Sequence, residues 1–440
     1  MKFYNRENEL AELSRIQQLA FTDCSRLTVI TGRRRIGKTS LILKATASTP
    51  TVYLFVGRKN EAALCAEFSQ IITQSLDVFI PSEIKTFRSL FQTLLEVAKT
   101  KSFTLVIDEF QEFYTINSSI YSDIQHIWDL YRKETKMNFI VSGSIYSLMQ
   151  QLFLNNKEPL FGRADNILKL KPFDLVTLKQ IISDYYPTYT NDDLLALYAF
   201  TGGVPKYVEL LCDNQKLSVN EMIAFMVRDN SLFTEEGRYL LIEEFGKNYG
   251  TYFSILAAIS SGINTQSEIE AKLGDKNLGG HLKRLIEDYN IIRRVRPILA
   301  KEGTLAVRYE IEDHFLKFWF NYFERNRSMV EIKNFGALQN LILDNYPTYS
   351  GIMLERYFTQ QFIESGNYRA IGSWWELKGN QHEIDIVALK LEKNKAIAVE
   401  VKRQRKNFKP EIFAEKVAYL KNKHLNNYDI EQICLTLEDM

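Results

Sequence analysis

The chain has 440 residues, which is more than one hydrophobic core normally serves, so we expect two to four domains. Hydrophobic residues make up 45% and charged residues 25%, as in globular proteins, and a net charge of +1 excludes a whole-chain attraction to nucleic acid. The four cysteines form no CxxC or Cys/His cluster, which argues against structural zinc, and the absence of a signal-like or long apolar segment predicts a cytoplasmic protein without a membrane span.

The first part of the chain alternates strand-like and helix-like segments. Amphipathic segments such as 61–76 and 119–135 separate short runs that are rich in β-branched and aromatic residues. The strand-like runs are 26–32, 51–57, 103–110, 138–144 and 166–173. This order predicts an α/β domain over residues 1–175, with a mostly parallel sheet and helices on both faces.

Three further domains are expected after residue 175. Residues 176–245 have a helical pattern that is interrupted by TGGVPKY. Residues 246–328 contain three short helical patterns and then two strand-like runs, which is the order of a winged helix. Residues 329–440 restart with a helix, three strands and a helix, which predicts a second α/β domain.

A phosphate-binding motif lies between the first predicted strand and the next predicted helix. The sequence GRRRIGKT (32–39) fits G-x-x-x-x-G-K-[ST], whose glycines allow a tight loop with backbone N–H groups that face phosphate at a helix N-terminus. We expect Lys38 to reach the β- and γ-phosphates of ATP and the Thr39 hydroxyl to ligate Mg²⁺. The predicted nucleotide-binding residues of this motif are Gly32, Gly37, Lys38, Thr39 and Ser40.

A pair of acids follows a later strand. The sequence TLVIDEF (104–110) is an apolar strand that ends in two carboxylates, which is the Walker B pattern. Asp108 is expected to hold Mg²⁺ through water, and Glu109 to polarise the attacking water. Two acids at a strand end are also common as solvated groups. Their position one strand–helix unit after the phosphate-binding motif favours a site that binds and hydrolyses ATP.

Together these motifs resemble the AAA-related (ASCE-type) P-loop ATPases, and more narrowly a prokaryotic, archaeal-type family close to the STAND and Orc/Cdc6-like groups. FYNRENEL (3–10) resembles the N-terminal box of that family, which implies that Arg6 and Glu7 lie near the base of the nucleotide. IVSGS (140–144) ends a strand where relatives have sensor 1, which implies that Ser142 or Ser144 lies near the γ-phosphate.

Two further motifs belong to this resemblance. FGRA (161–164) places Arg163 where relatives have an arginine finger, and an ordinary surface arginine is the alternative. GGVP (202–205) resembles the lid motif of the STAND group, which implies that Pro205 faces the nucleotide, and a simple helix break is the alternative. The resemblance therefore implies a helical lid at 176–245.

The segment 276–301 has a local excess of positive charge. Seven residues are basic and two are acidic, a difference of five: Lys276, Lys283, Arg284, Arg293, Arg294, Arg296 and Lys301 against Glu287 and Asp288. In DNA-binding winged helices the third helix and the wing meet the duplex, and Lys/Arg contacts with phosphate supply most of the non-specific affinity. The alternative is an internal packing or regulatory module, as in STAND-type ATPases.

Acids and a lysine lie on two strand-like segments near the C-terminus. In IAVEVKRQRK (397–406) the period-two alternation places Glu400 and Lys402 on one face. The preceding segment HEIDIVALK is joined to it by a hairpin turn, which places Asp385 on the same face. The order D-x14-E-x-K, with Glu355 on an upstream helix, resembles the PD-(D/E)xK nucleases of the restriction-endonuclease-like fold.

These residue types suit metal-dependent hydrolysis. Glu355, Asp385 and Glu400 are the predicted metal ligands, because carboxylate oxygens are preferred by Mg²⁺, and a bound metal lowers the pKa of water. Lys402 is expected to orient that water or to neutralise the transition state. The five basic residues of 402–409 suit a phosphate backbone. Ile384 stands where a proline often precedes the aspartate, and an inactive fold that is kept for binding is the alternative.

The sequence therefore predicts a Mg²⁺-dependent, ATP-hydrolysing AAA/STAND-like ATPase that acts on or near DNA and carries a candidate nuclease domain. The alternative is a STAND-like signalling switch, whose C-terminal domain is a non-catalytic module that binds protein or DNA. We expect ATP, ADP and DNA as partners, with self-association into a homo-oligomer as a further option.

Overall fold

The computed structural model describes residues 1–440 except 82, 247–248, 275–276, 302, 304–306 and 377–381. The chain forms two compact units, which we call the N-terminal unit (Tyr4–Lys171) and the C-terminal unit (Met1–Phe3 with Pro172–Met440). The predicted boundary after residue 175 lies four residues beyond this division. The other predicted boundaries lie inside the C-terminal unit.

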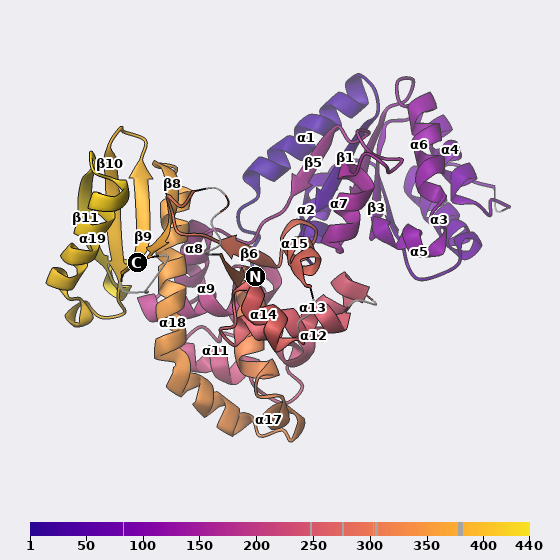
Figure 1. Ribbon diagram of the computed structural model, residues 1–440. Coiled ribbons are helices and arrows are strands. Elements are labelled where there is room, and N and C mark those ends of the chain that lie inside the picture. Colours follow the sequence, from indigo (N-terminus) through magenta and orange to yellow (C-terminus); the bar gives the residue numbers. More distant parts are fainter. Residues whose placement is uncertain (82, 247–248, 275–276, 302, 304–306, 377–381) are drawn as a thin grey trace. The chain divides into compact units, whose positions relative to one another are not determined.

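The N-terminal unit is built on a five-stranded parallel sheet with the order β2-β3-β4-β1-β5 (Figure 1). The strands are β1 (Arg26–Thr31), β2 (Thr51–Phe55), β3 (Phe103–Asp108), β4 (Met137–Ser142) and β5 (Asn166–Lys169). All of the strands predicted for this region are present, and the predicted α/β class with a parallel sheet is confirmed. Because the strands are parallel, the loops that follow β1, β3 and β4 meet at one edge of the sheet.

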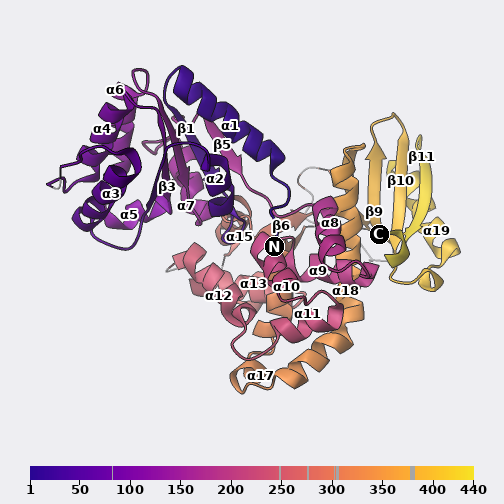
Figure 2. The same ribbon diagram turned by 180° about the vertical axis from the view of Figure 1, so that it is seen from behind.

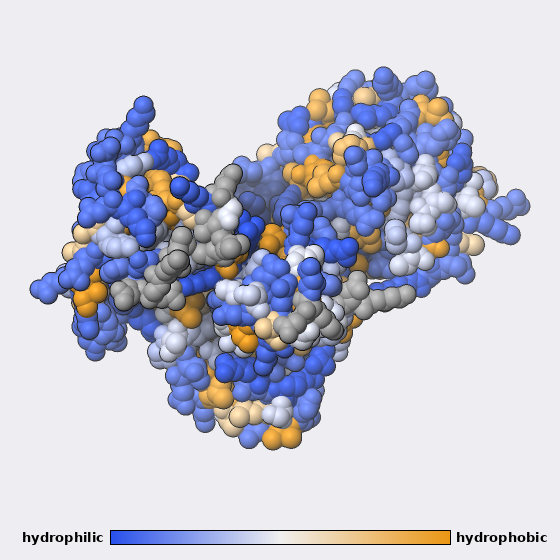
Figure 3. Space-filling view, viewed as in Figure 1, coloured by the Kyte–Doolittle hydropathy of each residue, from blue (hydrophilic) through white to orange (hydrophobic). Residues whose placement is uncertain are grey.

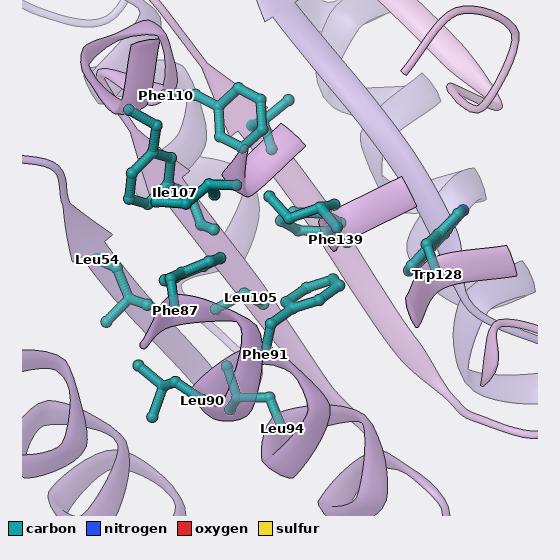
Figure 4. Packing of buried hydrophobic residues seen from close by; sticks show 14 of the residues in the cluster. Leu54, Phe87, Leu90, Phe91, Leu94, Leu105, Ile107, Phe110, Trp128 and Phe139 are labelled. Atoms are coloured by element: carbon teal, nitrogen blue, oxygen red, sulfur yellow. The ribbon is translucent and has the colours of Figure 1, made fainter. Parts of the chain in front are cut away.

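Helices cover both faces of this sheet. They are α1 (Glu7–Thr22), α2 (Lys38–Thr46), α3 (Glu61–Leu76), α4 (Phe87–Ala98), α5 (Phe113–Ile116), α6 (Ile120–Tyr131) and α7 (Tyr146–Leu154), with a 3₁₀ turn at Phe110–Glu112. Successive residues of β3 enter different cores, as strand geometry requires. Leu105 and Ile107 pack with α3, α4 and α6, whereas Val106 packs with Leu41 and Ile42 of α2. Figure 4 shows the phenylalanines and leucines of α4 against Leu105 and Ile107.

The C-terminal unit begins with a helical segment and a smaller helix–hairpin segment. The helices are α8 (Leu175–Tyr185), α9 (Asn191–Thr201), α10 (Pro205–Asp213), α11 (Val219–Met226) and α12 (Leu232–Phe245). Next come α13 (Tyr249–Ser260), α14 (Gln266–Lys272), α15 (Gly279–Glu287), β6 (Ile292–Val295), β7 (Arg308–Ile311), α16 (His314–Trp319), a π-helical turn (Phe320–Glu324) and α17 (Arg327–Glu331). Three helices followed by an antiparallel hairpin have the order expected from the sequence, and the winged-helix assignment itself stays a prediction.

A second, four-stranded sheet with the order β11-β10-β9-β8 ends the chain. Its elements are α18 (Phe335–Ser365), β8 (Tyr368–Trp375), β9 (Glu383–Lys390), β10 (Lys395–Val401), α19 (Pro410–His424) and β11 (Asp429–Leu435). Strand β9 is antiparallel to both neighbours, and β10 is parallel to β11. Figures 1 and 2 both show this sheet between α18 and α19. The sequence analysis did not predict β11, an edge strand with few buried residues and therefore a weak hydrophobic pattern.

None of the helices in the described part of the chain combines the length and apolar composition that a membrane span requires. The surface in Figure 3 is mainly hydrophilic, and its apolar residues are distributed in separate small patches.

Candidate functional site

The phosphate-binding loop follows β1, and two glycines give it its shape. Gly32 has φ +150°, and a Cβ there would lie 3.0 Å from the carbonyl oxygen of Leu170, so the loop approaches the backbone after β5 too closely for a side chain. Gly37 caps α2 with φ +90°, a left-handed conformation that favours glycine. The buried Lys38 turns back over the loop, and its Nζ donates to the carbonyl oxygen of Gly32 at 2.8 Å. The first backbone N–H groups of α2 follow this loop and lie at the edge of the sheet where phosphate binds in such loops.

Asp108, at the end of β3, collects donors from three neighbouring elements. The Thr39 hydroxyl donates to its Oδ2 at 3.2 Å, and the Ser142 hydroxyl donates to its Oδ1 at 2.5 Å. The Tyr53 hydroxyl also donates to Oδ2, and the backbone N–H of Glu109 donates to Oδ1 at 3.0 Å. The structure therefore brings together Thr39 and Asp108, which were predicted as metal ligands.

Tyr53 is a site residue that the sequence reasoning missed. It lies on β2, beside β3, and carries no motif signal. Burial, together with the hydrogen bond to Asp108, raises the pKa of its hydroxyl above the usual value, so it remains a donor at neutral pH.

Glu109 has a left-handed backbone conformation, φ 54° and ψ 41°, which costs about 1 kcal/mol for a residue other than glycine. Its side chain reaches the end of β4. Its Oε2 accepts hydrogen bonds from the Ser144 hydroxyl at 2.7 Å and from Gln111 Nε2 at 2.5 Å. Of the two serines left open by the sequence, Ser142 therefore contacts the first carboxylate and Ser144 contacts the second.

Gly143 stands between these serines because no side chain fits there. A Cβ would lie 2.3 Å from Gln111 Oε1 and 2.5 Å from the sulfur of Met149. The sequence SGS thus holds two hydroxyls at one strand end while the backbone passes directly over Gln111.

Three other predicted nucleotide-binding residues lie in different places. Arg6 is buried in the N-terminal unit, where its guanidinium donates to Glu9 at 3.1 Å and to the carbonyl oxygen of Lys171 at 2.5 Å. Ser40 is exposed on α2. Pro205 belongs to the C-terminal unit and occupies the first turn of α10, a position that suits proline because its missing N–H has no helical partner.

Arg163 lies three residues before β5, at the amino edge of the sheet. The phosphate-binding loop follows the carboxyl end of β1, the parallel neighbour of β5. A six-residue strand spans about 20 Å, which is longer than an arginine side chain. Arg163 instead pairs with Asp129 of α6 at 3.1 Å and donates to the carbonyl oxygen of Phe161. It is therefore separated from the phosphate-binding loop of its own unit.

A second group of predicted residues converges on the C-terminal sheet. Lys402 Nζ lies 2.9 Å from Glu400 Oε1 and 3.9 Å from Asp385 Oδ2. Asp385 lies on β9 beside an irregularity in the β8–β9 pairing, and its carboxylate accepts the backbone N–H of Val401 at 2.7 Å. Such irregularities bend a strand and re-aim its side chains. The predicted clustering of these two acids with Lys402 is present.

Glu355, on α18, belongs to the same cluster electrostatically. Burial and the charge of Asp385 raise the pKa of Glu355 to about 8. Burial also raises the pKa of Asp385 to about 6. The hydrogen bond from the Val401 N–H lowers this pKa, and the charge of Glu400 raises it. Raised carboxyl pKa values in a group of neighbouring acids are typical of functional sites, although buried ionic networks also produce them.

Lys416 of α19 completes this cluster and was not predicted. Its Nζ lies 3.3 Å from both carboxylate oxygens of Glu400. The donor set consists of oxygen atoms, as Mg²⁺ prefers, but Glu400 is held by two ammonium groups. In these side-chain positions, no group of three or more His, Cys, Asp and Glu side chains among the described residues could hold a metal ion.

The basic tail after Lys402 is partly used in ion pairs, although Arg405, Lys406 and Lys409 are exposed. Arg403 forms a bidentate pair with Asp192 of α9 at 2.9 and 3.0 Å and lies against the Tyr346 ring, and Arg405 pairs with Asp439 at 2.8 Å. Acids distant in the sequence thus bind both arginines, and the suitability of the tail for a phosphate backbone stays a prediction.

Part of the positive charge of the helix–hairpin segment is neutralised by ion pairs within the segment. Arg293 pairs with Glu310 at 2.9 Å and with Glu312 at 3.4 Å, two acids on or next to β7 that the count over 276–301 left out. Lys276 lies outside the described residues. Arg294 is exposed, and its role in binding DNA stays a prediction.

Two protein families match parts of the chain. Residues 3–211 match a family described as an ATPase domain predominantly from Archaea, and residues 319–413 match one described as archaeal and bacterial proteins of unknown function. An uncharacterised protein of Methanocaldococcus jannaschii is 31% identical over 410 residues, which cover 91% of this chain and 87% of that protein.

Two solved structures are similar to the chain. The Walker-type ATPase PABY2304 of Pyrococcus abyssi aligns with a TM-score of 0.55 and 18% identity, over 72% of this chain and 96% of that one. The ORC2 protein of Aeropyrum pernix aligns with a TM-score of 0.49 and 12% identity, over 75% and 96%. The first alignment shows a shared P-loop ATPase fold.

Proposed function

The chain belongs to the same family as the Methanocaldococcus jannaschii protein, with an N-terminal ATPase domain of the predominantly archaeal type, and from this premise we propose that it binds and hydrolyses ATP in the N-terminal unit. One observation carries the proposal. The hydroxyl of Thr39, directly after the phosphate-binding loop, lies 3.2 Å from Asp108, directly before Glu109, so the parts of a P-loop site meet at one edge of the sheet.

The residues divide the work by their chemistry. The loop N–H groups and Lys38 bind the phosphates, and Lys38 leaves the loop carbonyls to do so. The Thr39 hydroxyl and the Asp108 carboxylate are oxygen donors that suit Mg²⁺, which supplies neutralisation of phosphate charge when it is bound. Glu109, held by Ser144, accepts a proton from the attacking water.

The test is hydrolysis of ATP by the full chain with Lys38→Ala. We expect phosphate release to fall at least about a hundredfold, because a preorganised positive charge at the transferring phosphoryl group is lost. Lys44→Ala, an exposed lysine on the same helix, is the matched control and should keep the rate. Equal rates for wild type and Lys38→Ala would contradict the proposal.

We infer a second function for the C-terminal sheet, which is cleavage of phosphodiester bonds in nucleic acid with a divalent metal. The supporting observation is the convergence of Glu355, Asp385, Glu400 and Lys402 from one helix and two strands. A bound metal would supply an activated water. The chain itself would contribute the three carboxylates and the Lys402 ammonium, which favours a negatively charged phosphate at the site.

Incubation of plasmid and single-stranded DNA with Mg²⁺ or Mn²⁺, with and without ATP, tests this second function. Wild type should cut, and Asp385→Ala should not. Asp429→Ala, on the exposed start of β11, is the control and should cut like wild type. If the wild type does not cut either substrate, the alternative of a non-catalytic binding module replaces the nuclease, and salt-dependent DNA binding would identify its partner.

We also propose DNA as the partner of the helix–hairpin segment. Arg294 on β6 is exposed, so its charge can reach a partner. Arg294→Ala should weaken DNA binding and reduce its dependence on salt concentration by about one phosphate contact. An unchanged salt dependence would favour an internal packing role.

A further inference from the structure

Lys416 lies on the face of α19 that packs against the C-terminal sheet. Phe413, Val417 and Leu420 of this helix are buried in the same core as Ala396 and Ala398 of β10. Lys416 follows the same inner side of the helix, and its side chain is only 19% exposed. The helix thereby directs an ammonium group at the acid that comes two residues after Ala398.

That acid, Glu400, is contacted by the ammonium groups of two lysines. Lys416 Nζ is 3.3 Å from each of its oxygens, and Lys402 Nζ is 2.9 Å from Oε1. The Glu400 side chain is 10% exposed, so water screens these charges poorly. With Asp385 and Glu355 nearby, the cluster holds three carboxyl groups and two ammonium groups.

In these side-chain positions the acids among the described residues do not form a metal-holding group, and two ammonium groups lie at Glu400. An ammonium group and a divalent cation seek the same carboxylate oxygens, and they repel each other. The flexible stem of lysine lets its charge move by several ångströms without any change in the helix, unlike the rigid bidentate fork of arginine.

We propose that Lys416 is a substrate-binding residue of the phosphodiester-cleaving site, whose ammonium group competes with a divalent cation for Glu400 and, once displaced, holds the phosphate of the nucleic acid. This inference rests on the proposed second function. It assigns two lysines with different duties to the site. Lys402, directly after β10, stays beside the carboxylates, and Lys416, on α19, exchanges one anionic partner for another.

The other lysines of α19 do not share this environment. Lys421 is exposed, and Lys423 is exposed and donates to the Tyr419 hydroxyl at 3.3 Å. Lys421 therefore offers a matched control on the same helix, with equal charge and without contact to Glu400.

The experiment compares the full chain with Lys416→Gln, Lys416→Arg and Lys421→Gln. Mn²⁺ binding is measured by electron paramagnetic resonance without nucleotide or DNA, and the relevant site is the one that Asp385→Ala removes. DNA cleavage is then measured at saturating Mn²⁺. We expect Lys416→Gln to bind Mn²⁺ about tenfold more tightly and to cleave about tenfold more slowly.

These opposite directions separate the proposal from a purely structural role, because a loosened helix would not increase metal affinity. Lys416→Arg keeps the charge and should bind Mn²⁺ no more tightly than wild type, and Lys421→Gln should match wild type in both measurements. Wild-type affinity and rate in Lys416→Gln would overturn the role of Lys416 and leave the cleavage function intact. Wild type without Asp385-dependent Mn²⁺ binding and without cleavage would overturn both.

Discussion

The carboxylates of the two candidate sites are contacted by different kinds of donor. In the N-terminal unit, Asp108 accepts hydrogen bonds from hydroxyls and a backbone N–H, and Lys38 faces backbone carbonyls. In the C-terminal unit, Glu400 lies between the ammonium groups of Lys402 and Lys416. Hydroxyl donors leave the full carboxylate charge for an incoming cation, whereas ammonium groups neutralise it. We therefore expect the first site to accept a metal–nucleotide complex without rearrangement, and the second to rearrange before a cation binds.

The largest effect expected from this comparison is that of Glu109→Gln. Loss of the carboxylate that accepts the water proton should lower ATP hydrolysis by about 10²- to 10³-fold and leave ATP binding intact. Single-turnover hydrolysis and a binding titration measure the two quantities. Glu112→Gln, three residues along the chain, is the control. Hydrolysis within a few-fold of wild type would show that Glu109 is not the base.

The buried acids of the C-terminal site should make the free energy of unfolding depend on pH. The pKa values of Glu355 and Asp385 are raised to about 8 and about 6, so these two groups bind more protons in the folded protein than in the unfolded chain between about pH 4 and about pH 8. Stability should fall as the pH rises through this window, by at most about 1.4 kcal/mol per pH unit for each group, and level off above about pH 8.

Urea denaturation of the full chain in EDTA, from pH 5 to pH 8.5, measures this dependence. Glu355→Gln should flatten the upper part of the profile, because its side chain has no proton to lose. An equally steep decline in Glu355→Gln would mean that other groups cause it.

Smaller effects on ATP hydrolysis should distinguish Ser142 from Ser144. Ser144→Ala removes a hydrogen bond to the charged Glu109 and should lower kcat for ATP about tenfold, with an unchanged Mg²⁺ requirement. Ser142→Ala acts on Asp108 instead and should raise the Mg²⁺ concentration needed for half-maximal activity. If both variants shifted the Mg²⁺ requirement alike, the separate duties of the two serines would be wrong.

The smallest effect is expected for Arg163→Ala. Since Arg163 lies at the amino edge of the sheet, its removal should not change hydrolysis in dilute solution. Any increase of specific activity with protein concentration should disappear in this variant if the arginine serves a second copy of the chain. A large loss of activity in dilute solution would place Arg163 at its own nucleotide and contradict the geometry.

Local patterns predicted most of the N-terminal site. Gly32, Gly37, Lys38 and Thr39 are close neighbours in sequence, so one loop fixes their relative positions. Asp108 was predicted from the Walker B pattern, and Ser142 or Ser144 from the family resemblance; the parallel strands that carry them end at the same edge of the sheet. Tyr53 was missed because nothing in the chain near it indicates a site, and only the pairing of β2 with β3 brings it to Asp108.

The C-terminal unit was less predictable because its important contacts join distant segments. The hairpin register placed Asp385 near Glu400, but the arginines that follow Lys402 form ion pairs with Asp192 and Asp439. Free arginines and paired arginines look identical in a sequence, since the partner is chosen by the folding of other elements.

The sequence by itself determined the parallel sheet, the phosphate-binding motif with the acids at the end of β3, and the two acids and a lysine of the last hairpin. It could do so because strand periodicity, glycine conformations and motif spacing act over a few residues. Only the tertiary structure decided which cations neutralise these acids. The contact between Lys416 and Glu400 depends on the packing of α19 against β10, and a buried charge takes whichever partner the surrounding core brings within reach.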